Sequence, residues 1–68
     1  METRHSRFKR LALRRTNGII DRIRVLGNLA NKSSYDYSEQ EVERMFKAIE
    51  EQLRTSKAKF RSKRKFKF

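Results

Sequence analysis

The 68-residue chain contains no cysteine, no proline, two glycines and a single histidine. Without cysteine it can form neither a disulfide nor a zinc site built from thiolates. His5 lies among arginine and lysine residues that repel a cation, so we expect a solvated side chain there. We therefore predict no metal site and no cofactor. The absence of proline leaves long helices uninterrupted.

The groups that support catalysis are scarce as well. The sequence has no glycine-rich phosphate loop, and Asp21 and Asp36 are isolated carboxylates. The five glutamates between residues 39 and 51 fall on the side of a predicted helix that we expect to face solvent, where acidic groups commonly promote solubility. These observations predict that the protein is not an enzyme.

Long hydrophobic runs are also missing. None approaches the roughly 20 residues of a membrane span, and no apolar stretch of a secretory signal follows the basic start. We expect no membrane partner and a cytoplasmic location. Residues 1–16 have the arginine-rich composition of a mitochondrial transit peptide, but the equally basic C-terminal end favours one explanation for both. A cationic membrane-active peptide is a further alternative, which the acidic start of the second predicted helix disfavours.

What the chain has in abundance is positive charge, with a formal net charge of +11. Residues 1–16 contain six Lys/Arg and one acid, and residues 57–68 contain seven Lys/Arg and no acid. The residues between them are nearly neutral. A solvated, disordered tail is the simplest interpretation of one such run, but two runs on a small body favour phosphate binding. The predicted nucleic-acid-binding residues are Arg4, Arg7, Lys9, Arg10, Arg14, Arg15, Lys57, Lys59, Arg61, Lys63, Arg64, Lys65, Phe66, Lys67 and Phe68.

Aromatic residues flank the C-terminal basic run. Phe60, Phe66 and Phe68 are interleaved with Lys and Arg, and aromatic rings stack on unpaired bases. This pattern favours RNA over DNA, although DNA is possible. No recognition-helix or zinc-finger pattern is present, so we do not expect sequence-specific reading of a duplex.

Ser38 and Glu41 mark the start of a helix. In this Ser-x-x-Glu spacing, the serine side chain accepts from the Glu41 amide and the glutamate side chain accepts from the Ser38 amide, which is a capping box. Tyr37 and Val42 have the spacing of a hydrophobic staple around it. The sequence therefore predicts a helix that begins at Ser38.

The residues after Ser38 follow the helical period. On one face, Glu43 with Lys47 and Glu50 with Arg54 are acid-first pairs four residues apart, which we expect to form ion pairs. No glycine or proline interrupts the pattern, so the predicted helix extends to about residue 62. The other face carries an apolar stripe about 100° wide, formed by Val42, Met45, Phe46, Ile49, Leu53 and Phe60.

A second apolar stripe, about 60° wide, predicts an earlier helix over about 8–31. Gly18 and Gly27 each cost such a helix up to about 1 kcal/mol relative to alanine. A break after Asn17 is therefore an alternative, but we favour one continuous helix with a weak point at Gly18. Asn31 is a suitable left-handed residue for its C-terminal end. The stripe consists of Phe8, Ala12, Ile19, Ile23, Leu26 and Ala30.

Two helices with a connection at 32–37 predict an all-α fold, an antiparallel two-helix hairpin over residues 8–62. We expect residues 1–7 to form a basic N-terminal arm and residues 63–68 a basic, aromatic tail. A hairpin would bring both ends of the chain to one pole and concentrate the positive charge there. A chain of this size buries only about 60% of its unfolded surface, so we expect dimerisation or docking on a larger partner to complete the fold.

Apolar residues on both sides of the first stripe suggest where that partner would bind. Leu13 and Ile20 lie on one side, and Val25 and Leu29 on the other. They are candidates for a homodimer contact, for docking on a larger protein, or simply for half-exposed positions. The predicted function is that of a non-catalytic accessory protein that binds nucleic acid within a ribonucleoprotein or nucleoprotein assembly. The alternative is a small interaction or inhibitor protein that docks through these four side chains.

Overall fold

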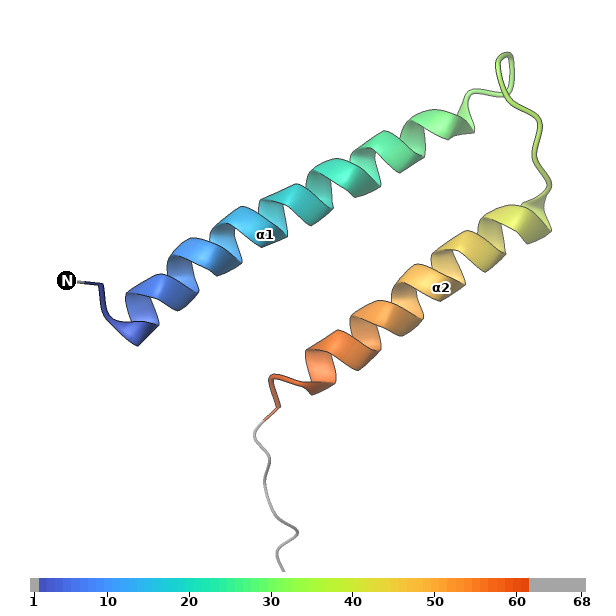
Figure 1. Ribbon diagram of the computed structural model, residues 1–68. Helices are drawn as coiled ribbons and strands as arrows, with labels where there is room; N and C mark the ends of the chain where they lie inside the picture. Colours follow the sequence, from blue (N-terminus) through green and yellow to red (C-terminus); the bar gives the residue numbers. More distant parts are fainter. Residues whose placement is uncertain (1, 62–68) are drawn as a thin grey trace, which may run out of the picture. The chain divides into compact units, whose positions relative to one another are not determined.

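The computed structural model describes residues 2–61, and within that range the regular secondary structure consists of helices without strands, as the sequence predicts (Figure 1). α1 spans Arg4–Gly27, a short 3-10 helix, η1, spans Asn28–Ala30, and α2 spans Glu39–Ala58. The chain divides into two compact units, Met1–Asp36 and Tyr37–Phe68. The all-α class is confirmed, and each unit is described below by itself.

α1 begins four residues earlier than expected. Thr3 is its N-cap: the Thr3 Oγ1 accepts from the Ser6 amide at 3.0 Å, and the Ser6 Oγ accepts from the Thr3 amide at 2.9 Å. This reciprocal pair is a capping box with serine in the place of the usual acid. Residues 4–7, predicted to belong to an arm, are therefore the first turn of α1. The predicted boundary at residue 8 was wrong because residue 8 is the first residue of the apolar stripe, whereas the helix itself begins at its N-cap, Thr3.

α1 continues without a break from its first to its last residue (Figure 1), and since Gly18 lies within its bounds, the prediction of one continuous helix is confirmed. Its end differs from the expectation. The α-helix stops at Gly27, and Asn31 has φ −70° and ψ 100°, which is extended backbone and not the left-handed region. The Asn31 Oδ1 instead accepts from the Ser33 amide at 3.1 Å and from the Ser33 hydroxyl at 2.6 Å. Asn31 thus stabilises the turn after the helix through its side chain.

α2 starts as predicted. The Ser38 Oγ accepts from the Glu41 amide at 3.1 Å, and the Glu41 Oε1 accepts from the Ser38 amide at 2.8 Å. Glu39 and Glu41 also place negative charge in the first turn, where the helix dipole favours it. The helix ends at Ala58, four residues before the predicted end at 62. After Leu53 the only apolar side chain on the stripe is Phe60. It is 75% exposed and therefore buries too little surface to stabilise a further turn of the helix.

The ion pairs on α2 differ from the prediction. Arg54 pairs with Glu51, three residues before it, and not with Glu50. Within the described chain, Glu43 and Lys47 also form no ion pair. Exposed pairs of this kind contribute only a few tenths of a kcal/mol, so α2 loses little by the exchange of partners.

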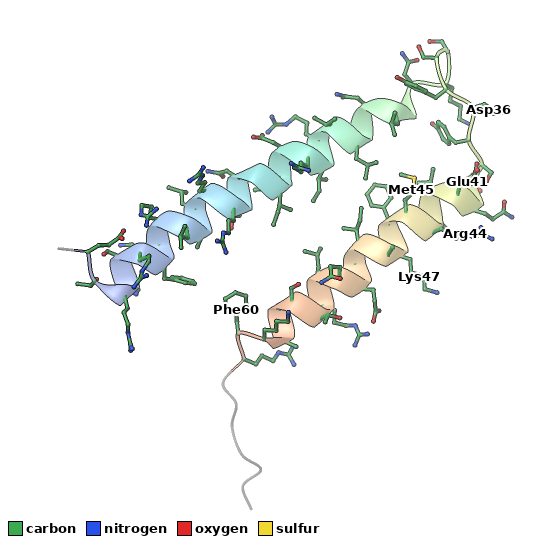
Figure 2. All side chains as sticks on the ribbon, in the orientation of Figure 1. Asp36, Glu41, Arg44, Met45, Lys47 and Phe60 are labelled. Carbon is green, nitrogen blue, oxygen red and sulfur yellow. The ribbon has the colours of Figure 1, made fainter. Side chains whose placement is uncertain are left out.

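Neither helix buries a side chain within the described residues. On α2, Val42, Met45 and Ile49 are half-buried, whereas Phe46 and Leu53 are 40% and 52% exposed. Figure 2 shows Met45 and Phe60 on one side of α2, and Arg44 and Lys47 on the other. Four residues of the apolar stripe, Val42, Phe46, Ile49 and Leu53, are separated by steps of four, three and four residues. This spacing is typical of helices that pack lengthwise on another helix.

Ser38→Ala removes the side-chain acceptor of the α2 cap. We expect the free energy of unfolding to fall by about 1 kcal/mol, measured as a lower midpoint of thermal unfolding by far-UV circular dichroism. Ser34→Ala, which changes the same residue type in the connection without touching a cap, is the matched control. Equal midpoints for the two variants would contradict the role of Ser38.

Candidate nucleic-acid interface

α1 is the most positively charged element that the structure describes. Between Arg4 and Gly27 it contains eight Lys/Arg side chains and one carboxylate, Asp21. All eight are exposed. They are Arg4, Arg7, Lys9, Arg10, Arg14, Arg15, Arg22 and Arg24.

Two of these cations are ion-paired. The Arg10 Nε donates to the Glu2 Oε2 at 2.8 Å and its Nη2 to Glu2 Oε1 at 3.2 Å, and this carboxylate raises the pKa of Arg10 above its ordinary value. The Arg24 Nη1 lies 3.2 Å from the Asp21 Oδ1. Both pairs are exposed to solvent and contribute little to stability. The two carboxylates offset the positive charges of Arg10 and Arg24.

Five arginines without a carboxylate partner in the described chain fall on one face of α1. At 100° per residue they lie within a sector of about 100°, and at 1.5 Å per residue they extend over about 27 Å. We call this surface the arginine face. It consists of Arg4, Arg7, Arg14, Arg15 and Arg22. Guanidinium groups make bidentate contacts with phosphate, so a row of them suits a polyanion with regularly spaced charges.

The electrostatics of α1 are unfavourable in the absence of an anion. Its first turn contains no acid, so Arg4 and Arg7 place positive charge at the positive end of the helix dipole. Arg7 and Arg10 are three residues apart and Arg10 and Arg14 four, which are spacings at which like charges repel. α2 shows the opposite arrangement, with two acids in its first turn. A phosphate beside α1 would relieve both effects.

The other predicted binding residues are distributed differently. Lys9 is on α1 but lies outside the arginine face, and Arg10 lies at its border, held by Glu2. Lys57 is in the last turn of α2, Lys59 caps its C-terminal end, and Arg61 follows the helix. The predicted residues Lys63, Arg64, Lys65, Phe66, Lys67 and Phe68 lie outside the described residues.

Arg22 is a member of the arginine face that sequence reasoning missed. The N-terminal basic segment considered in the sequence ends at residue 16, and Arg22 lies six residues beyond it. A count around the helix would have found it, because Arg15 and Arg22 are seven residues apart and therefore lie on the same side.

The four predicted interface residues are all exposed. Leu13 is 67% exposed, Ile20 50%, Val25 64% and Leu29 44%. The first three belong to α1, whereas Leu29 lies in η1. Four exposed aliphatic side chains on one 27-residue stretch leave apolar area available to a partner.

Between residues 2 and 61 there is no cluster of three or more histidine, cysteine, aspartate or glutamate side chains with the geometry of a metal site. His5 is exposed in the first turn of α1. None of the described helices has both the length and the apolar character needed to cross a bilayer.

Comparisons with known proteins yield no match: no protein-family model, no curated protein and no solved structure is significantly similar to this chain.

Arg4→Glu places a carboxylate at the first helical position of α1. We expect the free energy of unfolding to rise by about 0.3–1 kcal/mol, because the negative charge favours the helix dipole; thermal unfolding followed by circular dichroism measures it. Arg15→Glu changes the net charge equally at mid-helix and should shift the midpoint less. If both variants shift it by the same amount, net charge and not the dipole is responsible.

Proposed function

We propose that the protein is a non-catalytic accessory protein that binds nucleic acid, with RNA favoured over DNA, within a ribonucleoprotein or nucleoprotein assembly. The observation that supports this most is the charge of α1, where six of eight Lys/Arg side chains have no carboxylate partner in the described chain. Releasing the counterions of phosphates is the main source of non-specific affinity for such surfaces. The second basic segment, residues 57–68, adds seven further cations.

The preference for RNA comes from the sequence. Phe66 and Phe68 alternate with basic residues in the C-terminal segment, and aromatic rings next to arginine and lysine hold splayed bases of single-stranded loops. Duplex DNA offers phosphates but no unpaired bases. We therefore propose two kinds of contact, phosphates on α1 and phosphates with bases on the C-terminal segment.

We further propose that α1 and α2 form an antiparallel hairpin, completed by a second copy or a larger partner. Each helix carries an apolar stripe that its own unit leaves unburied, and the four-and-three spacing from Val42 to Leu53 on α2 is that of a helix packed along its length. A connection of the observed length is common between antiparallel neighbours. The hairpin would bring both basic segments to one pole.

The second candidate is docking on a larger, acidic protein. The exposure of Leu13, Ile20 and Val25, each 50% or more, favours it. In this case the basic side chains would steer the encounter and the apolar ones would supply the contact.

Binding to a structured RNA tests the first candidate. We expect the logarithm of the association constant to fall linearly with the logarithm of salt concentration, because phosphate contacts release counterions. Replacing Lys63, Arg64 and Lys65 by glutamate should abolish much of this binding; replacing the solvent-facing Arg44 and Lys47 by glutamate is a control on α2. RNA binding without salt dependence contradicts phosphate contacts. Loss of a protein complex with RNA binding retained would favour the docking candidate.

Phe46→Ala tests the hairpin. If the α2 stripe is buried against a neighbouring helix, the substitution should lower the free energy of unfolding by about 3 kcal/mol or more, and Ile49→Ala should behave similarly. Lys47→Ala, next to Phe46 on the opposite face, is the matched control. Thermal unfolding that is the same for Phe46→Ala and Lys47→Ala would show that the stripe packs on nothing.

A further inference from the structure

Gly18 is a costly residue at its position in α1. A glycine in a helix interior destabilises it by up to about 1 kcal/mol relative to alanine. Within the described part of its own unit, nothing requires glycine there: no described glycine has a positive φ, and a Cβ added at Gly18 would meet nothing within 4 Å. The backbone and the neighbours of α1 in this unit therefore do not explain the glycine.

Gly18 lies at the centre of the arginine face. At 100° per residue its direction falls midway between Arg14 and Arg22, and along the helix axis it lies between Arg15 and Arg22. A glycine allows the helix backbone to approach a ligand more closely than any other residue does. The long guanidinium side chains around it can extend past a ligand that lies over this point.

Resting on the nucleic-acid function proposed above, we propose that the arginine face with Gly18 at its centre is the site where the sugar-phosphate backbone of a base-paired nucleic acid lies against α1. Arg22 belongs to this site. Arg10 and Arg24 do not, because Glu2 and Asp21 hold them in ion pairs.

The composition of the face favours a base-paired ligand over a single strand. Single strands are held by several aromatic rings on which successive bases stack, whereas α1 has one aromatic residue, Phe8, which lies on the apolar stripe at the edge of the arginine face. Leu11 and Val25, which share the sector, are uncharged, and the carboxylate of Asp21 lies just outside the sector in an ion pair with Arg24. A helix presents its side chains at fixed intervals, which suits the regular phosphates of a duplex.

Gly18→Ala separates stability from binding. We expect the free protein to unfold at a higher temperature, because alanine is the better helix former. Its affinity for a blunt RNA duplex should fall about tenfold, since the added methyl group blocks close approach. Gly27→Ala is the matched control: Gly27 is also open to solvent and ends α1 on the side away from the arginine face, so this variant should bind the duplex as the unaltered chain does.

Arg22→Gln and Arg44→Gln each remove one guanidinium that has no carboxylate partner in the described chain, the first from the arginine face and the second from α2. Arg22→Gln should reduce the slope of log affinity against log salt by about 0.9, the value for one lost duplex phosphate contact. Arg44→Gln should leave the slope nearly unchanged. Equal effects of the two substitutions overturn the assignment of the face.

The probes are an RNA duplex, a DNA duplex of the same sequence and the separate RNA strands. The site is supported if the unaltered chain binds either duplex and Gly18→Ala weakens that binding. A preference for the RNA duplex would indicate additional contacts to the 2′-hydroxyl groups. Duplex binding that Gly18→Ala leaves unchanged or strengthens overturns the inference while the proposed function stands. The same result follows if Gly18→Ala and Arg22→Gln weaken only the single strands. Failure of the unaltered chain to bind any of the probes would instead count against the proposed function itself.

Discussion

Repulsion between like charges is the main constraint on the stability of α1. Only Glu2 and Asp21 offset the eight cations of the helix, and its first turn has no acid to meet the dipole. No buried side chain compensates within the described residues. A helix with this composition is more stable beside an anion than alone, so binding and folding of α1 favour each other.

The two helices divide the physical tasks between them. α2 is close to neutral, begins with a capping box that includes a carboxylate, and carries a regular apolar stripe, all of which stabilise a helix and prepare it to pack. α1 carries the charge, a mid-helix glycine and a less regular stripe. The first arrangement favours packing on another helix, and the second favours contact with an anion.

Local signals in the sequence predicted much of the fold. The Ser38 cap was recognisable because its acceptor and donor are three residues apart, and the missing proline indicated the continuous α1. The cap at Thr3 was missed because Ser6 replaces the usual glutamate or glutamine, and the end of α2 because the charge after Leu53 outweighs one phenylalanine. The membership of Arg22 in the arginine face is visible only when the charges are plotted around the helix axis. The packing of the two helices stays a prediction, since it depends on contacts distant in sequence.

The cap at Thr3 orders the first turn of α1 and so lowers the conformational entropy that this turn would lose on binding. Because Arg4 and Arg7 are attached to backbone that is already ordered, a ligand that meets them has no chain segment left to immobilise, only rotatable side chains. An unstructured arm with the same charges would wrap its ligand but lose conformational freedom on doing so. Compared with an unstructured arm, the capped helix can contact a ligand over a smaller surface, but it loses less conformational entropy on binding.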